Sequence, residues 1–219
     1  MRSKKGRSGV WVDIAVVAAI VGTGVVVAGI TGTSSSTDLA IPGCEEVIQE
    51  EDLMRINYAF TTGAEVARAD EPWITDSKLN GMTEALVGAL PAGTVVEPDS
   101  VTSRLEFSGD RETYSVAGST ADAGASGTIT SDGRTGLLDV IVGRADQPPG
   151  PCFVGTVDER VTSQDGAVFD VQDRGDTRRV VAITPDETRI EVTSVGVMTI
   201  DQLTDIASAP GLRIDAPGR

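Results

Sequence analysis

The chain has 219 residues, 40% of them apolar and 4% aromatic, and its 33 acidic and 18 basic residues give a net charge of −15. The absence of histidine excludes Ser-His-Asp and Cys-His catalysis and most zinc sites. An acidic surface repels phosphate backbones and anionic headgroups, so we expect no nucleic-acid partner.

The first thirty residues predict a membrane anchor. Residues 1–9 carry four basic side chains and no acid, and residues 10–30 are uncharged apart from Asp13. The uncharged run 14–30 would form roughly 26 Å of helix, which meets the lower limit for crossing a bilayer. Basic residues before the span orient the N-terminus into the cytoplasm. We therefore expect a single-pass cell-membrane protein, with 1–9 as a cytoplasmic stub and 10–30 as a signal anchor in the lipid bilayer.

The sequence of this span bears on both its cleavage and its self-association. The apolar run is longer than that of a cleavable signal peptide and no Ala-x-Ala pattern closes it, which favours an uncleaved anchor over a cleaved one. Small residues four apart, Ala18 with Gly22 and Gly24 with Ala28, would let two helices approach closely. Self-association through the span is therefore a further hypothesis.

The remainder of the chain is strongly acidic. Residues 31–40 are rich in Gly, Ser and Thr and predict a flexible tether. Residues 41–219 are enough for one extracytoplasmic domain. From residue 31 onward 14 basic and 32 acidic residues give a net charge of −18. We interpret this charge as a source of solubility that also disfavours acidic partners.

The first half of this domain has a helical pattern. Residues 44–56 crowd acids into their first turns, which suits the N-terminal end of a helix dipole. Residues 74–93 predict a second helix, with Asp76 or Ser77 as its N-cap and Pro91 at its end. Four apolar residues recur there at helical spacing: Leu79, Met82, Leu86 and Leu90.

From residue 101 onward the pattern changes to strands. Residues 101–109 alternate polar and apolar side chains, as a half-buried strand does. Three hairpins follow, with turns at Asp132-Gly133, Asp165-Gly166 and Pro185-Asp186. We expect about seven or eight antiparallel strands, most of them with one polar face.

The C-terminal part carries a helix start signal. Thr199 and Gln202 have the spacing of a capping box, and Met198 and Leu203 that of the hydrophobic staple around it. Pro210-Gly211 ends the helix, which is too short to be stable unless it packs on the sheet. The predicted fold class is α+β: an antiparallel sheet of about seven or eight strands packed with two or three helices, preceded by one transmembrane helix.

The only two cysteines, Cys44 and Cys152, predict a disulfide. An exported domain meets an oxidising environment, and two cysteines form one bridge. Without histidine, two thiols lack the further ligands that a metal site requires. Glu45 and Glu46 would raise the thiol pKa of Cys44, which argues against a redox sensor.

The carboxylates are the remaining source of chemistry. Four acids in one stretch, Asp165, Asp170, Asp173 and Asp176, offer calcium ligands, but their spacing departs from an EF-hand-type loop. A hairpin with solvated acids explains the same stretch, with a weak calcium site as the alternative. No nucleophile elbow, phosphate-binding loop or HExxH zinc motif occurs. We expect no catalytic, cofactor-binding or metal-binding residue, and no enzyme.

Four segments of the chain carry a resemblance: ALPAGTVV (89–96), PPGPC (148–152), ITPDETRIEV (183–192) and TIDQLTDIASAPGLR (199–213). Together they are similar to a group of actinobacterial, N-terminally anchored exported proteins of unknown function. The resemblance covers most of residues 76–213 and implies export, anchoring and a pair of cysteines, without an activity. In that group the third segment carries a Pro-Asp-Gly turn. Glu187 stands in place of the glycine here, which argues against a left-handed residue in this turn.

These observations favour a non-catalytic interaction module of the cell envelope or surface, of unknown specificity. The alternative is a carrier of a lipid or small hydrophobic ligand, held in a pocket between sheet and helices. An anchored enzyme that uses carboxylates alone is a third alternative. The expected partners are the lipid bilayer through residues 10–30 and an unknown protein or hydrophobic ligand.

Overall fold

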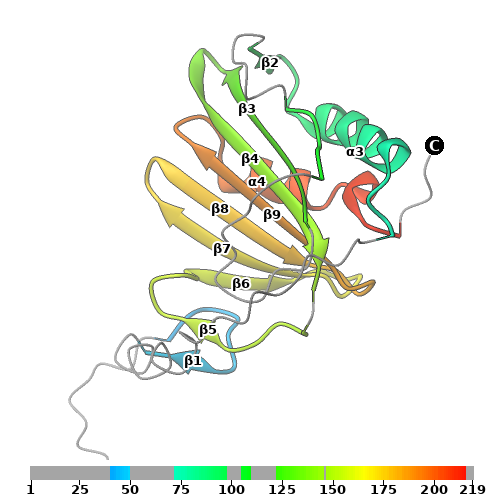
Figure 1. The fold of residues 1–219 in the computed structure, drawn as a ribbon. Coiled ribbons are helices and arrows are strands. Elements are labelled where there is room, and N and C mark those ends of the chain that lie inside the picture. Colours follow the sequence, from blue (N-terminus) through cyan, green and yellow to red (C-terminus); the bar gives the residue numbers. More distant parts are fainter. Residues whose placement is uncertain (1–39, 50–71, 98–104, 110–121, 146, 216–219) are drawn as a thin grey trace, which may run out of the picture. The chain divides into compact units, whose positions relative to one another are not determined.

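The computed structural model describes residues 40–49, 72–97, 105–109, 122–145 and 147–215. These residues form a seven-stranded antiparallel sheet with helices α3 (Asp76–Ala89) and α4 (Ile200–Ala207) on one of its faces (Figure 1). The predicted α+β class is therefore confirmed. Within the described part of the chain, no helix is long and apolar enough to span a membrane. The predicted anchor, residues 10–30, lies outside that part, as do the small residues Ala18, Gly22, Gly24 and Ala28.

The sheet joins two sequential blocks of strands. In spatial order its members are β2 (Val95–Val96), β3 (Ala123–Ser131), β4 (Arg134–Arg144), β9 (Thr188–Val195), β8 (Thr177–Ile183), β7 (Val168–Arg174) and β6 (Glu159–Thr162). The last four follow one another along the chain as hairpins. The final strand, β9, returns to pair with β4, so the two blocks close into one sheet with β6 at its edge.

The core lies between this sheet and the helices. Alternate side chains of the strands point towards the helices and form buried rows. One row crosses five strands: the half-buried Val171 and the buried Val180, Val192, Val140 and Ala125. Met82 and Leu86 of α3, and Leu203 and Ile206 of α4, pack against this face and are fully buried. The space between sheet and helices is therefore filled by side chains.

The predicted turns of the hairpins are confirmed. Asp132 and Gly133 both have positive φ, 52° and 74°, as a two-residue type I′ turn requires. Ser163 and Ala167 close the β6–β7 turn through a 2.8 Å backbone hydrogen bond, with Gly166 at φ 87°. Gly175, at φ 74°, lies in the turn between β7 and β8. The sequence pattern did not predict this turn.

Glu187 corrects one expectation. Its φ of 61° lies in the left-handed region, although glutamate carries a β-carbon. Its N–H donates to the carbonyl of Thr184 at 3.0 Å, and its own carbonyl accepts the N–H of Ala145 at 2.7 Å. These two hydrogen bonds hold the backbone of the β8–β9 turn in a conformation that a side chain disfavours.

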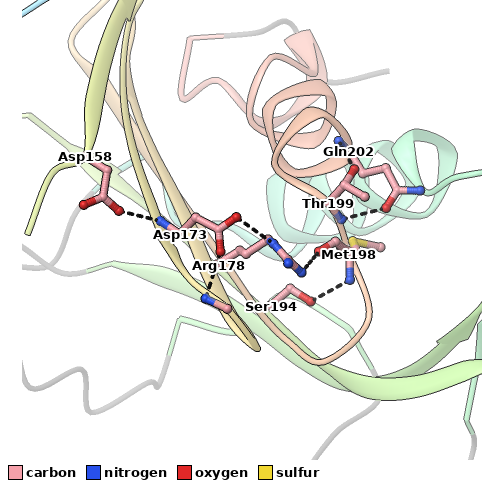
Figure 2. Close-up of polar contacts among 8 residues, drawn as sticks. Asp158, Asp173, Arg178, Ser194, Met198, Thr199 and Gln202 are labelled. Atoms are coloured by element: carbon pink, nitrogen blue, oxygen red, sulfur yellow. Dashed lines mark hydrogen bonds and ion pairs between the residues drawn. The ribbon is translucent and has the colours of Figure 1, made fainter. Parts of the chain in front are cut away.

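The start of α4 matches the predicted capping box. The side chain of Thr199 accepts the N–H of Gln202 at 3.3 Å, and the side chain of Gln202 accepts the N–H of Thr199 at 2.9 Å. Figure 2 shows how this start is tied to the sheet: Arg178 donates to the carbonyl of Met198 at 3.0 Å and to Asp173 at 3.1 Å. The α3 helix is capped by Thr75, whose side chain accepts from Lys78, and neither Asp76 nor Ser77 is the cap.

Two predicted elements are wrong in the described residues. Residues 44–49 are not helical: β1 (Val47–Ile48) pairs in parallel with β5 (Cys152–Phe153) as a separate two-stranded sheet. Residues 105–109 make one isolated bridge in place of a strand, because Leu105 has a φ of 51° that breaks the extended backbone.

Candidate functional site

The predicted disulfide joins Cys44 to Cys152 across 108 residues of sequence. Cys152 is fully buried with Ile41 and Val157 in a second small core, separate from the main one. Because both cysteines of the chain are bonded to each other, a thiol nucleophile and a cysteine metal ligand are excluded in this oxidised state.

Arg160 of the edge strand β6 holds both cysteine-bearing segments. Its guanidinium binds the carboxylate of Asp170 through two hydrogen bonds of 2.6 and 2.8 Å, and it donates to the carbonyl of Gly150 at 2.7 Å. Its backbone N–H donates to Pro42 at 2.9 Å. The hydrogen bond to Asp170, against the effect of burial, raises the pKa of Arg160. This residue had no predicted role, because nothing local to it in the sequence indicates contacts with positions 42 and 150.

The segment that contains Pro42 and Gly43 lies against the free edge of the sheet at Arg160. Gly43 lies against the carbonyl of Arg160, and its φ is 76°. An unpaired edge is a template for pairing with another strand, and a crossing segment blocks that pairing. The backbone of β6 is therefore occupied at Arg160 by Pro42 and Gly43.

A groove of about 400 Å³ opens between β6, β7 and α4, on the helix side of the sheet. Its floor is apolar and comes from six residues: Val161, Ala167, Phe169, Val171, Ile200 and Ala207. The short helix α4 packs mainly on β8 and β9 (Figure 1). The helix-facing side of the edge strand β6 therefore lines the open groove. Val161, at the centre of β6, is consequently 45% exposed.

The rim of the groove is acidic. Glu159 of β6 and Asp201 of α4 line it and are exposed. Among the residues that the structure describes, neither carboxylate takes part in an ion pair. Arg213 lines the opposite part of the groove but binds Asp165 at 3.1 Å. The hydrogen bond from Ser163, followed by that from Arg213, lowers the pKa of Asp165 and keeps this pair charged.

The acids considered as calcium ligands are not brought together. Asp165 lies at the β6–β7 turn with Arg213, and Asp170 binds Arg160 on the opposite face of the sheet. Asp173 accepts from Gly175 and Arg178, which lowers its pKa. Within the described ranges, no group of three or more His, Cys, Asp or Glu side chains has the geometry to hold a metal ion. The hairpins predicted for this stretch are present, because β7 pairs antiparallel with β6 and with β8.

Apart from Asp165, which was considered as a calcium ligand, the groove residues were not singled out from the sequence. Glu159 and Val161 belong to an ordinary strand, and Asp201 belongs to an ordinary capped helix. Val161 and Asp201 are 40 positions apart in the sequence. The one available signal is length, because an eight-residue helix is about 12 Å long and cannot cover a wide sheet.

Comparisons of the chain with protein-family models, with curated proteins and with solved structures find no match. The functional argument therefore rests on the geometry of the described residues.

Proposed function

We propose that the protein is a non-catalytic, membrane-anchored extracytoplasmic binding module. Its binding site is the groove between β6, β7 and α4, which receives an apolar part of another molecule. The observation that carries this proposal is the apolar floor of the groove, which stays open beside a filled core. The anchor is the apolar segment 10–30, with the N-terminus in the cytoplasm.

The groove has the properties of a preformed site. Phe169 and Ala207 of the floor are held by the main core, so the surface does not need to assemble when a partner arrives. Val161 is one of five large apolar side chains that the described part of the chain leaves clearly exposed. A concave apolar surface with a few polar groups around it is typical of binding sites.

The polar groups of the groove favour binding over catalysis. A carboxylate-only enzyme needs two acids in contrasting environments, so that one is protonated while the other is ionised. Glu159 and Asp201 are both exposed at the rim. The ion pair of Asp165 with Arg213 leaves that carboxylate ionised and occupied.

A carrier of a small hydrophobic ligand is the second candidate. The volume of the groove, about 400 Å³, lies at the lower end of the range of small-molecule sites, about 300–1,000 Å³. Because the groove is open and the core beside it is filled, it suits part of a ligand more than an enclosed lipid.

The proposal is tested with a photo-crosslinking amino acid placed at position 161 of the full chain in its native membrane. Position 87 is the control, since Val87 is 51% exposed on α3, away from the groove. A recurrent polypeptide adduct at 161 and not at 87 supports the binding module. A lipid or small-molecule adduct at 161 supports the carrier, and equal or absent labelling at the two positions contradicts both.

A further inference from the structure

On the basis of the proposed function, we propose a chemical class for the partner: a cationic amphipathic polypeptide segment. Its apolar side chains enter the groove and its Lys or Arg side chains pair with Glu159 and Asp201. The inference rests on the apolar floor, the acidic rim and the edge of β6, which Pro42 and Gly43 contact at Arg160.

The floor selects apolar side chains. Val171 ends one apolar row of the sheet and Val161 pairs with Phe169 in the neighbouring row, so both valines line the open groove. Ile200 lines it from α4. The available volume, about 400 Å³, accommodates a few side chains and not a whole domain. A partner therefore inserts one short apolar stretch.

The rim selects positive charge. Glu159 and Asp201 stand on opposite walls, one on the edge strand and the other in the first turn of the helix. No ion pair to either is found in the described residues, and the one groove arginine, Arg213, is engaged by Asp165. Two acidic side chains placed in this way attract Lys or Arg and repel acidic segments. The net charge of −15 on the chain extends the attraction over distance.

The edge strand directs the partner to the groove itself. Extended peptides often bind by adding a strand to an exposed sheet edge. At Arg160 this edge already bonds to Pro42, and Gly43 lies against its carbonyl. Recognition in the groove therefore depends on the side chains of the partner and not on backbone pairing with β6. The partner sequence must be amphipathic.

Other occupants fit the charges less well. A second copy of the chain would bring the same acidic rim and the same net charge of −15. Anionic lipid headgroups would be repelled for the same reason. The segment of this chain at residues 50–71 carries more acidic than basic side chains.

The experiment uses the full chain in zwitterionic lipid nanodiscs and a fluorescent twelve-residue peptide of leucine and lysine with helical amphipathic spacing. Empty nanodiscs give the membrane background. A peptide of the same composition in scrambled order and a leucine–glutamate peptide are the controls. Affinity is measured by fluorescence anisotropy at low and high salt. We expect the amphipathic cationic peptide to bind more tightly than either control, and its binding to weaken as salt rises.

Matched variants assign the binding to the groove. The double variant Glu159→Gln/Asp201→Asn is expected to weaken binding roughly five- to tenfold and to flatten the salt dependence. Asp205→Asn, an exposed acid of α4 that does not line the groove, is the charge control and should change the affinity less than about twofold. Val161→Ser should weaken binding, whereas Val87→Ser should not. Thermal unfolding of each variant verifies that it is folded.

The outcomes separate this inference from the proposed function. Equal binding of the scrambled or acidic peptide, or an unchanged affinity in the Glu159/Asp201 double variant, overturns the cationic partner. An adduct from position 161 to residues 50–71 or to a second copy also overturns it. If no peptide binds but position 161 still gives a specific external adduct, the binding module stands and the partner class is wrong. If neither is observed, both are wrong.

Discussion

Gly43 lies so close to the main-chain carbonyl of Arg160 that a β-carbon at position 43 would be 1.8 Å from the carbonyl oxygen. The contact joins the residue before Cys44 to the edge strand of the main sheet. Together with the hydrogen bond from Arg160 to Pro42, it fixes the point at which the chain enters the described domain. Gly43 is therefore required both by packing and by its positive φ.

Replacement of this glycine by alanine is expected to destabilise the domain. Gly43→Ala should lower the free energy of unfolding by about 2–3 kcal/mol, because the β-carbon collides with backbone and the left-handed conformation becomes strained. The matched control is Gly150→Ala in the PPGPC segment, where a β-carbon meets no atom within 4 Å. Its effect should stay within about 0.5 kcal/mol. Equal unfolding midpoints of the two oxidised variants in urea would contradict the contact.

Arg160 is expected to contribute more to the stability of the domain than its position on a short edge strand suggests. Arg160→Ala leaves Asp170 and the carbonyl of Gly150 without their partner, so we expect a loss of about 2–3 kcal/mol. Arg174→Ala on β7 is the control, because its ion pair with Asp158 is largely exposed and should contribute less than about 1 kcal/mol.

Hydrogen exchange gives the local readout for Arg160. In Arg160→Ala the amides of β1 and β5 should exchange faster, while those of the central strands β4 and β9 keep their protection. Unchanged exchange in β1 and β5 would show that the arginine does not hold the cysteine-bearing segments.

The predictable features of this fold are those with local causes. Thr199 and Gln202 lie three residues apart, and Asp132 and Gly133 are adjacent, so propensity and hydrogen bonding within a few residues decide their structure. Val47 and Cys152 pair across the sequence, and the acids around position 47 conceal this, because their pattern also suits a helix start. Local pattern therefore gave the wrong element there.

The groove depends on tertiary packing, which is less local than strand pairing. Whether Val161 is covered is decided by the position at which α4 crosses the sheet, and this follows from the packing of Leu203 and Ile206 in the core. Neither the strand sequence nor the helix sequence contains that position. The acidic rim follows from the same placement, because it brings Asp201 to the groove that Glu159 lines.

Glu191 predicts an acid-dependent part of the stability. Burial opposes its ionisation, but the hydrogen bond and charge of Arg179, at 2.6 Å, and then Arg189 outweigh burial and hold its pKa below the ordinary value. A lowered pKa in the folded state stabilises the fold at pH above the unfolded value, about 4.3, and this contribution is lost as pH falls through the folded pKa. At pH 7 we expect Glu191→Gln to cost about 2 kcal/mol.

The pH dependence distinguishes this charge effect from a packing effect. As the pH is lowered below about 4, the difference in unfolding free energy between the native chain and Glu191→Gln should shrink, because the native glutamate becomes protonated. Chemical denaturation at pH 7, 5, 4 and 3 measures this difference. A difference that stays constant over the whole series would mean that Glu191 acts through packing alone.

Glu187 has a left-handed backbone conformation that glycine adopts more easily. At φ 61° a glutamate pays a conformational cost that Glu187→Gly removes, while the backbone hydrogen bonds to Thr184 and Ala145 remain available. The greater freedom of glycine in the unfolded chain offsets part of the gain, so we expect a net stabilisation of about 0.5–1 kcal/mol. The opposite exchange, Gly175→Ala at φ 74°, meets no neighbouring atom and should destabilise by about 1 kcal/mol through backbone strain alone. Thermal unfolding of the two variants should therefore shift the midpoint in opposite directions, and a loss of stability in Glu187→Gly would indicate that the glutamate side chain itself supports the turn.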